Sequence, residues 1–411
     1  MQLRPFQREG VDFIKSHSHI LLADEPGLGK TVQVIKAIDE AALFPCLVLC
    51  PCSLKEVWRK HFLEWANVTA TVDKVSDITI TNYEKLNKVL PQLKEIKWDI
   101  LICDESHLLS NKKTKRFRNV RQLARTASRV ALLTGTPIMN RPLELLGQLD
   151  LLRATGKFGG ERAFLETFCG ATLTKYGWDF TGATNLVSLH KKLSGVFLRR
   201  TKEEVAIELP SKAHAVVPIT IKSREYHKAE KAFVGGHLER FEKLRMLAVR
   251  AKEKACFDWI DNFLASGEKL VVFAHHRELQ QALLARWPGA CSILGSQSSS
   301  SRKQAVESFQ SGKANLIVCS LQAAGVGLTL TAASNVAFLE FPWTPGLLNQ
   351  AIDRVHRITQ TKPVTAWYLY AADTIEEDML CLCENKEVIT SIVHDGRVVI
   401  KNIVKKMMGV E

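Results

Sequence analysis

Two short segments near opposite ends of the chain carry residue types that act on phosphate groups. The first ends in Gly27-Leu-Gly-Lys-Thr31, after an apolar run and before the helical stretch Val32–Ile38, which is the context of a phosphate-binding loop. Glycines let backbone N–H groups approach a phosphate, the lysine can reach the β and γ phosphates, and the threonine hydroxyl can ligate Mg²⁺. Asp24 stands where the commoner motif has its first glycine, so the match is partial. We predict a nucleotide site made by Pro26, Gly27, Leu28, Gly29, Lys30 and Thr31.

The second segment, Gln350–Gln360, contains two arginines three residues apart. On a helix this spacing places Arg354 and Arg357 on one face, where they can clamp a transferring phosphoryl group. We predict catalytic roles for both arginines and assign Gln350 to the nucleotide-binding set.

A third segment, Asp99–His107, supplies carboxylates. An apolar strand ending in Asp104 and Glu105 suits magnesium-dependent phosphoryl transfer. We expect Asp104 to hold the metal and Glu105 to orient and deprotonate the attacking water. The alternative is an acidic turn that caps the next helix. Lys30 in the same chain favours the catalytic interpretation.

Short apolar runs alternating with longer helical stretches must position these groups, and this alternation is typical of α/β proteins with parallel sheets. The expected strands of a first set are His19–Ala23, Cys46–Cys50, Asp77–Thr81, Ile100–Cys103 and Val130–Thr134. Those of a second set are Leu270–Ala274, Cys291–Leu294, Leu316–Cys319, Asn335–Leu339 and Val364–Leu369. Two successive sets predict two similar lobes, residues 1–215 and 216–411. We expect a helical insertion without a strand series at about 139–215, a helical lead-in at about 222–266 and a C-terminal helical brace at about 374–411.

Composition narrows the class of protein. The 411 residues are 46% hydrophobic and 24% charged, as in soluble globular proteins, and the net charge of +13 favours a polyanionic partner such as nucleic acid. A merely basic surface is the alternative. No apolar run reaches spanning length and no signal-peptide pattern begins the chain, so we expect no membrane attachment. The predicted location is cytoplasmic in a bacterium or virus-infected cell, and nuclear in a eukaryote.

The ten cysteines lie within or beside apolar runs, where reduced and buried thiols are expected. The pairs Cys50/Cys52 and Cys381/Cys383 have no second pair at finger-like spacing, so we do not expect a metal site there. The adjacent His275 and His276 are likewise not expected to bind a metal.

Basic and short polar residues indicate where nucleic acid binds. Between Leu108 and Pro142 the chain has a series of lysines and arginines and no acidic residue. This run can neutralise phosphates, although a solvated basic helix face is the alternative. Polar groups at strand ends suit phosphate contacts in both halves of the chain. The predicted contacts are Ser53, Thr81, Asn82, Lys112, Lys113, Arg277, Ser320 and Thr329, with Trp343 either on the nucleic-acid backbone or in a core.

These motifs, in this order, resemble the Swi/Snf-type ATPases of helicase superfamily 2. The resemblance extends from Leu3-Arg-Pro-Phe-Gln7 through Phe197-Leu-Arg-Arg200 to Gln350–Gln360. Within that family, Asp104-Glu-Ser-His107 followed by basic residues is most similar to the annealing-helicase (HARP-type) branch, as is Glu340-Phe-Pro-Trp-Thr-Pro-Gly346.

The resemblance implies two tandem RecA-like lobes and several residue roles. Gln7 would recognise adenine, Arg354 and Arg357 would be arginine fingers from the second lobe, and the loop with Gly325, Gly327 and Thr329 would couple nucleotide state to nucleic acid. Gly327 is also assigned to the nucleotide-binding set. ATP and Mg²⁺ are the implied substrate and metal.

The expected function is a DNA-stimulated ATPase that translocates on double-stranded or branched DNA without sequence specificity, and reanneals strands or remodels forks. Alternatives within the enzyme class are a protein–DNA remodeller and a conventional unwinding helicase, and RNA is a less favoured substrate. A non-catalytic, nucleotide-gated DNA-binding module is the alternative from another class. We expect a monomer, and the sequence names no protein partner.

Overall fold

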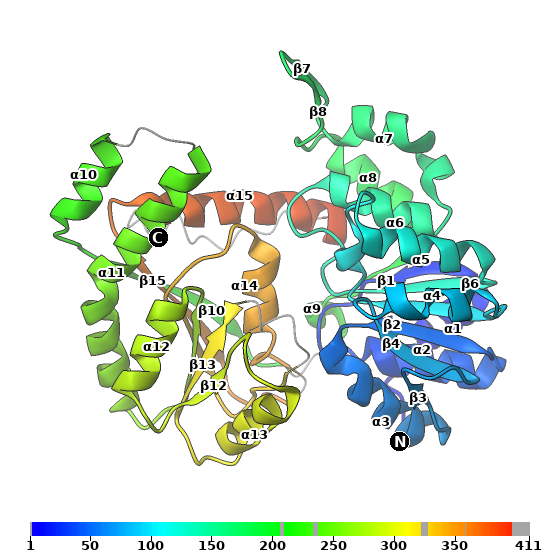
Figure 1. Cartoon of the computed structure of the whole chain (residues 1–411), viewed down its shortest axis with the longest axis horizontal. Coiled ribbons are helices and arrows are strands. Elements are labelled where there is room, and N and C mark those ends of the chain that lie inside the picture. Colours follow the sequence, from blue (N-terminus) through cyan, green and yellow to red (C-terminus); the bar gives the residue numbers. More distant parts are fainter. Residues whose placement is uncertain (1, 206–208, 233–236, 322–327, 358, 397–411) are drawn as a thin grey trace. The chain divides into compact units, whose positions relative to one another are not determined.

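The computed structural model describes residues 2–205, 209–232, 237–321, 328–357 and 359–396. These residues form two compact units. We call residues 2–205 with 388–396 the first lobe, and residues 209–387 the second lobe. Figure 1 labels the helices and strands named below.

In the described residues, the first lobe is built on a seven-stranded sheet in the order β3-β4-β2-β5-β6-β1-β9, in which every pair is parallel. Its strands are β1 (His19–Leu22), β2 (Cys46–Cys50), β3 (Thr71–Val72), β4 (Ile78–Asn82), β5 (Ile100–Asp104), β6 (Arg129–Leu133) and β9 (Phe197–Leu198). Its α-helices are α1 (Pro5–Ser16), α2 (Lys30–Ala41), α3 (Lys55–Ala66), α4 (Leu86–Lys94), α5 (Lys115–Thr126), α6 (Leu145–Leu151), α7 (Gly160–Phe168), α8 (Leu186–Leu193) and α9 (Lys202–Val205). Short 3-10 helices are η1 (Cys52–Leu54), η2 (Ser106–Leu109), η3 (Pro142–Glu144) and η4 (Thr155–Phe158).

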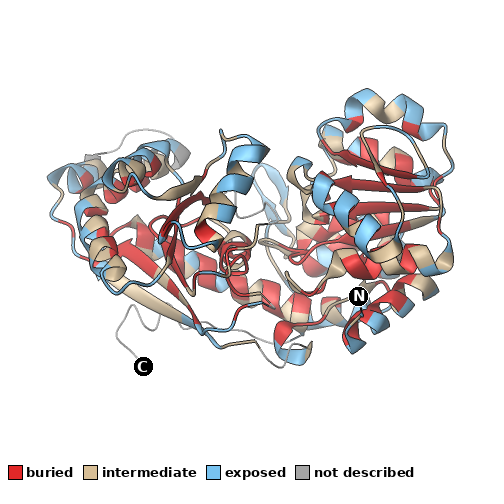
Figure 2. Ribbon diagram, turned by 90° about the horizontal axis from the view of Figure 1, so that it is seen from below, coloured by how far each residue is buried: buried red, intermediate tan, exposed pale blue. Residues whose placement is uncertain are grey.

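Helices cover both faces of this sheet, which explains why most of its strands are mainly apolar and buried. Along β1, Leu21 packs into the cluster that contains side chains of α4 to α8, whereas Ile20 and Leu22 pack with α1 to α3. Figure 2 shows the strands as buried layers beneath more exposed helices.

In the described residues, the second lobe has a six-stranded parallel sheet in the order β10-β15-β14-β11-β13-β12. Its strands are β10 (Lys212–Ile219), β11 (Leu270–Ala274), β12 (Cys291–Ile293), β13 (Leu316–Ser320), β14 (Asn335–Phe338) and β15 (Val364–Ala371). Its helices are α10 (Arg224–Ala232), α11 (His237–Leu264), α12 (Arg277–Arg286), α13 (Ser299–Gln310), α14 (Pro345–Ile352) and α15 (Ile375–Asp395). One core cluster joins the sheet to α10–α12 and the other joins it to α13–α15.

The α/β fold with two lobes is confirmed. Each of the ten predicted strands corresponds to an observed strand whose ends differ by no more than two residues. The expectation of no strand series at 139–215 is wrong, because β9 joins the first sheet, β7 (Thr172–Thr174) pairs with β8 (Gly177–Asp179), and β10 begins in this region. The expected boundary at residue 215 falls inside β10, a strand of the second sheet. This strand is partly exposed, begins with polar residues and contains Pro218, so its short apolar run was not recognised as a strand.

The C-terminal helix α15 contributes to both lobes, since its residues up to 387 belong to the second lobe and those from 388 to the first. Val393 is buried in the first-lobe core, and His394 Nε2 accepts a hydrogen bond from the Ile138 N–H at 3.1 Å. None of the helices in the described part of the chain has the length and apolar character needed to span a bilayer.

Candidate active site

The phosphate-binding loop lies between β1 and α2, at the carboxyl edge of the first sheet. Gly29 has a φ of 80° and is the N-cap of α2. This positive φ favours glycine, and a Cβ there would lie 2.5 Å from Nε2 of Gln7 and displace the end of that side chain. Gln7 Nε2 donates to the Leu28 carbonyl oxygen at 3.2 Å. The predicted adenine-contacting residue therefore lies against the loop, where it can sense a bound nucleotide.

Lys30 begins α2 and its side chain folds back over the loop. Its Nζ donates to the carbonyl oxygens of Asp24, at 2.5 Å, and Glu25, at 3.3 Å. Burial lowers the pKa of Lys30, and the nearby carboxylates of Asp24, Glu105 and Asp104 act in the opposite direction. A phosphate in the loop can replace the two carbonyls as acceptor for this ammonium group.

Asp104 ends β5 in a buried position at the same edge of the sheet. Its Oδ2 accepts a hydrogen bond from Trp58 Nε1 at 2.8 Å, and its Oδ1 accepts one from the Glu105 N–H at 2.9 Å. Burial and the neighbouring Glu105 carboxylate raise the pKa of Asp104 to about 6. A cation would favour the ionised form, so this carboxylate is suited to meet a metal ion.

Glu105 has the left-handed backbone conformation, with a φ of 51°. That conformation is uncommon for a residue with a side chain, and such residues cluster at functional sites. Glu105 is the N-cap residue of η2 but makes no side-chain capping hydrogen bond. Helix capping, the alternative considered from the sequence, therefore does not account for this residue.

His107 and Gln148 connect the acidic pair to the turn after β6. His107 Nδ1 lies 3.3 Å from Glu105 Oε2 and 3.1 Å from the Thr134 hydroxyl. Gln148 Oε1 accepts from the Ser106 hydroxyl at 3.0 Å, while its Nε2 donates to the Pro137 carbonyl at 2.7 Å. Gln148 lies in the expected insertion, where no sequence motif marks it as a functional residue. The residues around Glu105 are thus held by a connected polar network.

Asp24, the departure from the commoner loop motif, is a buried structural anchor. Its carboxylate accepts hydrogen bonds from Arg200 Nε at 3.0 Å and from Arg200 Nη2 at 2.6 Å. It accepts a third from Gln33 Nε2 at 3.0 Å. The Arg200 guanidinium also bonds the Phe6 carbonyl. This bidentate pair ties the phosphate-binding loop to the segment after β9. Arg200 belongs to the motif Phe197–Arg200, which by itself indicates no role for this side chain.

Arg199 makes a second set of contacts at the loop. Its Nη1 donates to the carbonyl oxygens of Ala23, at 2.8 Å, and Gly135, at 3.0 Å. Its Nε pairs with Asp395 near the end of α15. One guanidinium therefore joins the end of β1, the turn after β6 and the last residues of the C-terminal helix.

The two arginines of the second lobe lie in turns that follow α14, and the expectation that a helix face presents them is wrong. The helix ends at Ile352 with Asp353 as its C-cap residue. Arg354 is buried, and Arg357 donates from Nε to the Asp353 carbonyl at 3.0 Å and from Nη1 to the Thr329 hydroxyl at 3.1 Å. Gln350 is buried within α14. Gly325 and Gly327 lie outside the described residues.

Comparison with protein families identifies both halves of the chain. Residues 6–258 match the SNF2-related domain, and residues 254–359 match the helicase conserved C-terminal domain. The chain belongs to the SNF2-related family of helicases. Membership implies nucleotide binding, in agreement with the loop geometry.

Curated relatives are similar over most of this SNF2-related chain. A Xenopus tropicalis protein, SWI/SNF-related matrix-associated actin-dependent regulator of chromatin subfamily A-like protein 1, is 35% identical over 93% of the chain and 44% of its own length. The human DNA annealing helicase and endonuclease ZRANB3 is 33% identical over 96% of the chain and 41% of its own length. The chain thus spans less than half the length of these relatives. The SWI2/SNF2 ATPase core of Sulfolobus solfataricus, solved in complex with dsDNA, aligns with 99% of the chain and 96% of its own length, at 25% identity and a TM-score of 0.47.

The predicted DNA contacts of the first SNF2-related lobe differ in accessibility. Ser53 lies in η1, after β2. Thr81 and Asn82 end β4, but both are buried and bond nearby acids: the Thr81 hydroxyl donates to Asp73 at 2.9 Å, and Asn82 Nδ2 donates to Glu84 at 2.7 Å. Either side chain would have to break its hydrogen bond to the acidic residue before it could contact a phosphate.

The basic run extends along α5, so its two ends lie at opposite edges of the first sheet. Lys112 pairs with Glu161 at 2.6 Å, whereas Lys113 is exposed. The helix then leads away from the carboxyl edge, because its C-terminal end is followed directly by the start of β6. The start of the run therefore lies at the carboxyl edge, where β5 ends in Asp104, whereas the residues at the end of α5 lie at the opposite edge of the sheet.

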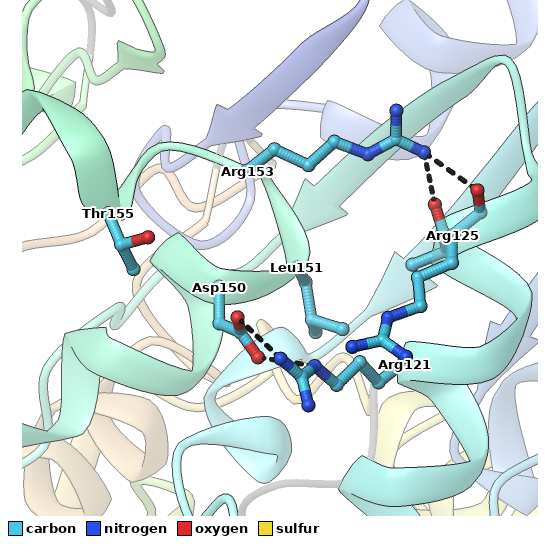
Figure 3. Close-up of a pocket in the computed structure, with 7 residues that line it drawn as sticks. Arg121, Arg125, Asp150, Leu151, Arg153 and Thr155 are labelled. Atoms are coloured by element: carbon cyan, nitrogen blue, oxygen red, sulfur yellow. Dashed lines mark hydrogen bonds and ion pairs between the residues drawn. The ribbon is translucent and has the colours of Figure 1, made fainter. Parts of the chain in front are cut away.

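The later basic residues line a separate pocket at the end of α5, shown in Figure 3. Arg121 Nε pairs with Asp150 Oδ2 at 2.8 Å, and Arg153 Nη2 donates to the carbonyl oxygens of Ala124 and Arg125, each at 3.0 Å. The ion pair neutralises Arg121, and the hydrogen bonds of Arg153 cap the C-terminal end of α5. Both sets of contacts therefore have a structural role.

The candidate DNA residues of the second lobe lie at strand and helix ends. Arg277 is exposed at the first position of α12, and Ser320 ends β13 in a buried position. Thr329 accepts the Arg357 hydrogen bond described above. Trp343 is half-buried, with its ring centroid 3.9 Å from that of Phe241, which favours the packing alternative for much of this side chain.

The pair His276–Glu340 predicts a pH dependence for the second lobe. The carboxylate of the buried Glu340 accepts hydrogen bonds from the backbone N–H groups of His275, at 2.5 Å, and His276, at 2.9 Å. It also forms a hydrogen bond with Nδ1 of the His276 ring. The hydrogen bond to Glu340 raises the pKa of His276 above its usual 6.5. The contribution of this ion pair to stability is therefore complete below the pKa of His276 in the unfolded chain. It is lost as the pH rises through the higher pKa of His276 in the folded chain.

We expect His276→Gln to lower the thermal unfolding midpoint more at about pH 6 than at about pH 9. Unfolding followed by circular dichroism at both pH values measures the difference, with His275→Gln as the control for an adjacent ring. An equal loss at both pH values would show that the ion pair does not contribute.

Proposed function

We propose that this SNF2-related chain hydrolyses ATP and uses the cycle to move along double-stranded DNA without sequence preference. The observation that carries the proposal is the convergence of Lys30 with Asp104 and Glu105, supported by the electrostatic interaction of these groups and by the position of Gln7 on the same loop. An ammonium group, a buried carboxylate and a second, oriented carboxylate are the parts that phosphoryl transfer to water requires.

Each residue of the first lobe then has a distinct task. Lys30 and the backbone N–H groups of residues 27–31 hold the phosphates, and Gln7 recognises adenine. Glu105 accepts the proton of the attacking water, and His107, 3.3 Å from its Oε2, helps to fix the orientation of the carboxylate. Asp104 and Thr31 offer the carboxylate and hydroxyl oxygens that Mg²⁺ prefers, so these residues fit that ion. When bound, Mg²⁺ would neutralise charge that develops on the phosphates.

Arg354 and Arg357 are assigned as the cationic groups that stabilise charge on the transferring phosphoryl group, with Gln350 and Gly327 as further nucleotide contacts. Arg357 is held by Asp353 and Thr329, which preorganises its guanidinium. Because Thr329 is also a proposed DNA contact, this hydrogen bond offers a direct route by which DNA could influence the arginine.

Duplex DNA is the proposed track, with strand reannealing or remodelling of forks and branches as the outcome. Support comes from the net charge of +13, from Ser53, Lys113 and Arg277 at edges of the two sheets, and from relatives that include a DNA annealing helicase. Phosphate contacts of this kind carry no base information. A protein–DNA remodeller, an unwinding helicase and a non-catalytic nucleotide-gated module are the alternatives.

Phosphate release by the purified chain tests the proposal. Rates are measured without nucleic acid and with single-stranded, duplex, forked and RNA ligands of matched length, each with and without Mg²⁺. We expect the strongest stimulation by duplex or forked DNA. Annealing and unwinding assays on the same fork separate the enzyme alternatives. No hydrolysis with any ligand would overturn the proposal in favour of a non-catalytic module.

A further inference from the structure

The first lobe carries a small antiparallel hairpin that its core does not cover. Strands β7 and β8 pair with Thr172 opposite Asp179 and Thr174 opposite Gly177, so that Lys175 and Tyr176 form the tip. Figure 1 shows the hairpin extending away from α7 and α8. An isolated two-stranded hairpin is at best marginally stable in water, so its presence calls for a physical reason.

Large apolar side chains are concentrated on this hairpin. Tyr176 is 88% exposed, Leu173 is 72% exposed and Trp178 is 58% exposed. Among the residues whose burial the structure describes, Tyr176 and Trp178 are the aromatic members of the set of exposed large hydrophobic side chains. Clustered exposure of this kind marks an interaction site, whereas single exposed apolar residues are ordinary.

The neck of the hairpin is fixed to α7. Thr184 donates from its hydroxyl to the Thr167 carbonyl at 2.8 Å and accepts from the Gly170 N–H at 3.3 Å. Asn185 Nδ2 donates to the same carbonyl at 2.8 Å. The two chain segments cross where a Cβ on Gly170 would lie 3.1 Å from the Gly182 Cα, so larger residues there would push them apart.

Hydrogen bonds of Thr174 also stabilise the turn at the tip. The Thr174 hydroxyl donates to the Gly177 carbonyl at 2.7 Å and accepts from the Tyr176 N–H at 3.2 Å. Gly177 has a φ of 112°, which favours glycine. The exposed rings therefore project from a preorganised support, and binding through them loses little conformational entropy.

The chemistry of the hairpin favours an anionic partner with flat aromatic faces. Lys175 Nζ lies 5.0 Å from the centroid of the Tyr176 ring. The one carboxylate of the two strands, Asp179, accepts hydrogen bonds from the Thr181 N–H at 2.9 Å and hydroxyl at 3.0 Å. A cation next to exposed rings matches a phosphate next to a base, whereas an apolar protein surface would leave Lys175 without a counterpart.

We propose that the β7–β8 hairpin stacks its aromatic tip on unpaired or terminal bases, at positions where duplex DNA ends or branches. Within a continuous duplex each base is covered on both faces, so only forks, junctions and ends offer a free face for Tyr176 or Trp178. The hairpin thus directs the motor to branched DNA. This inference rests on the proposed DNA-dependent function and names the DNA structure that the chain prefers.

The test compares the full chain with a Tyr176→Ala/Trp178→Ala double variant. DNA concentrations for half-maximal ATPase stimulation are measured with a covalently closed circular duplex and with a fork. Loss of base stacking should raise the value for the fork about 5- to 150-fold, because one stacked base contributes that range, and should leave the value for the closed circle within about twofold. Val187→Ala, which shortens an exposed apolar side chain on α8, is the matched control and should match the unsubstituted chain.

A nucleotide-free binding assay separates this inference from the proposed function. A fork with 2-aminopurine at the branch point should change fluorescence on binding the unsubstituted chain and much less on binding the double variant, while Tyr176→Phe/Trp178→Phe should retain the signal. This result can be obtained even if no DNA stimulates hydrolysis, in which case only the ATPase proposal fails. Equal behaviour of the double variant and the unsubstituted chain on forks overturns the inference, as does an equal loss on closed circles. Altered self-association without a change in the DNA signal would identify a protein-docking surface instead.

Discussion

Glu105→Gln is expected to lower DNA-stimulated ATP hydrolysis by about 10²- to 10⁴-fold, the usual contribution of a general base. The amide keeps the size of the side chain but cannot accept the proton of the attacking water. Nucleotide affinity should change little, because Lys30 and the loop backbone are untouched. Steady-state phosphate release and equilibrium binding of a labelled nucleotide measure the two quantities separately.

Glu56→Gln is the control for this substitution, since Glu56 is an exposed carboxylate of the same lobe that pairs with Arg59 at 2.7 Å. Its hydrolysis rate should equal that of the unsubstituted chain. If Glu105→Gln hydrolysed ATP within twofold of that rate, another group would have to serve as the base.

Asp24→Ala should destabilise the first lobe by about 3–5 kcal/mol, the usual cost of leaving one member of a buried ion pair without its partner. Asp24 is fully buried and Arg200 nearly so, and the two are joined by two side-chain hydrogen bonds. Loss of the carboxylate would leave the guanidinium with the Gln33 and Phe6 oxygens and with the largely exposed Glu9 carboxylate, whose Oε2 lies 3.7 Å from Nη1. Urea unfolding followed by circular dichroism measures the change in the free energy of unfolding.

Two further variants identify the cause of that loss. Asp39→Ala removes an aspartate from a partly exposed pair with Lys36 on α2, and should cost no more than about 1 kcal/mol. Asp24→Leu combined with Arg200→Met replaces the buried pair by apolar groups and should recover much of the stability lost in Asp24→Ala. Equal destabilisation by Asp24→Ala and Asp39→Ala would refute the role of Asp24 as a buried anchor.

Local sequence was sufficient for those parts of the fold whose signal lies in consecutive residues. Most of the ten strands were predicted because they are short, mainly apolar runs, which a parallel sheet covered on both faces favours. Lys30, Asp104 and Glu105 were found for a related reason. Asp104 and Glu105 lie at the end of a strand and Lys30 lies in the loop motif that follows another strand, so their places in the sequence fix their places at the carboxyl edge of the sheet.

Contacts between distant segments were decided by the tertiary structure. Asp24 looked like a defect in a motif until its carboxylate was seen to bind Arg200, 176 residues away. Gln148 lies in a region without a recognisable pattern, yet it joins the Glu105 segment to the turn after β6. Arg354 and Arg357 have helical spacing, but α14 ends before them.

The same division applies to the surface. Tyr176 and Trp178 are ordinary members of the sequence, because aromatic residues are more often buried than exposed and their spacing also fits a strand that packs on a core. Only the fold shows that the core ends at α7 and α8 and leaves these rings outside it. The sequence by itself determined the family, the strands and the nucleotide loop, since these depend on neighbouring residues. The tertiary structure decided the buried anchor and the exposed hairpin, because burial and pairing depend on residues far away in the chain.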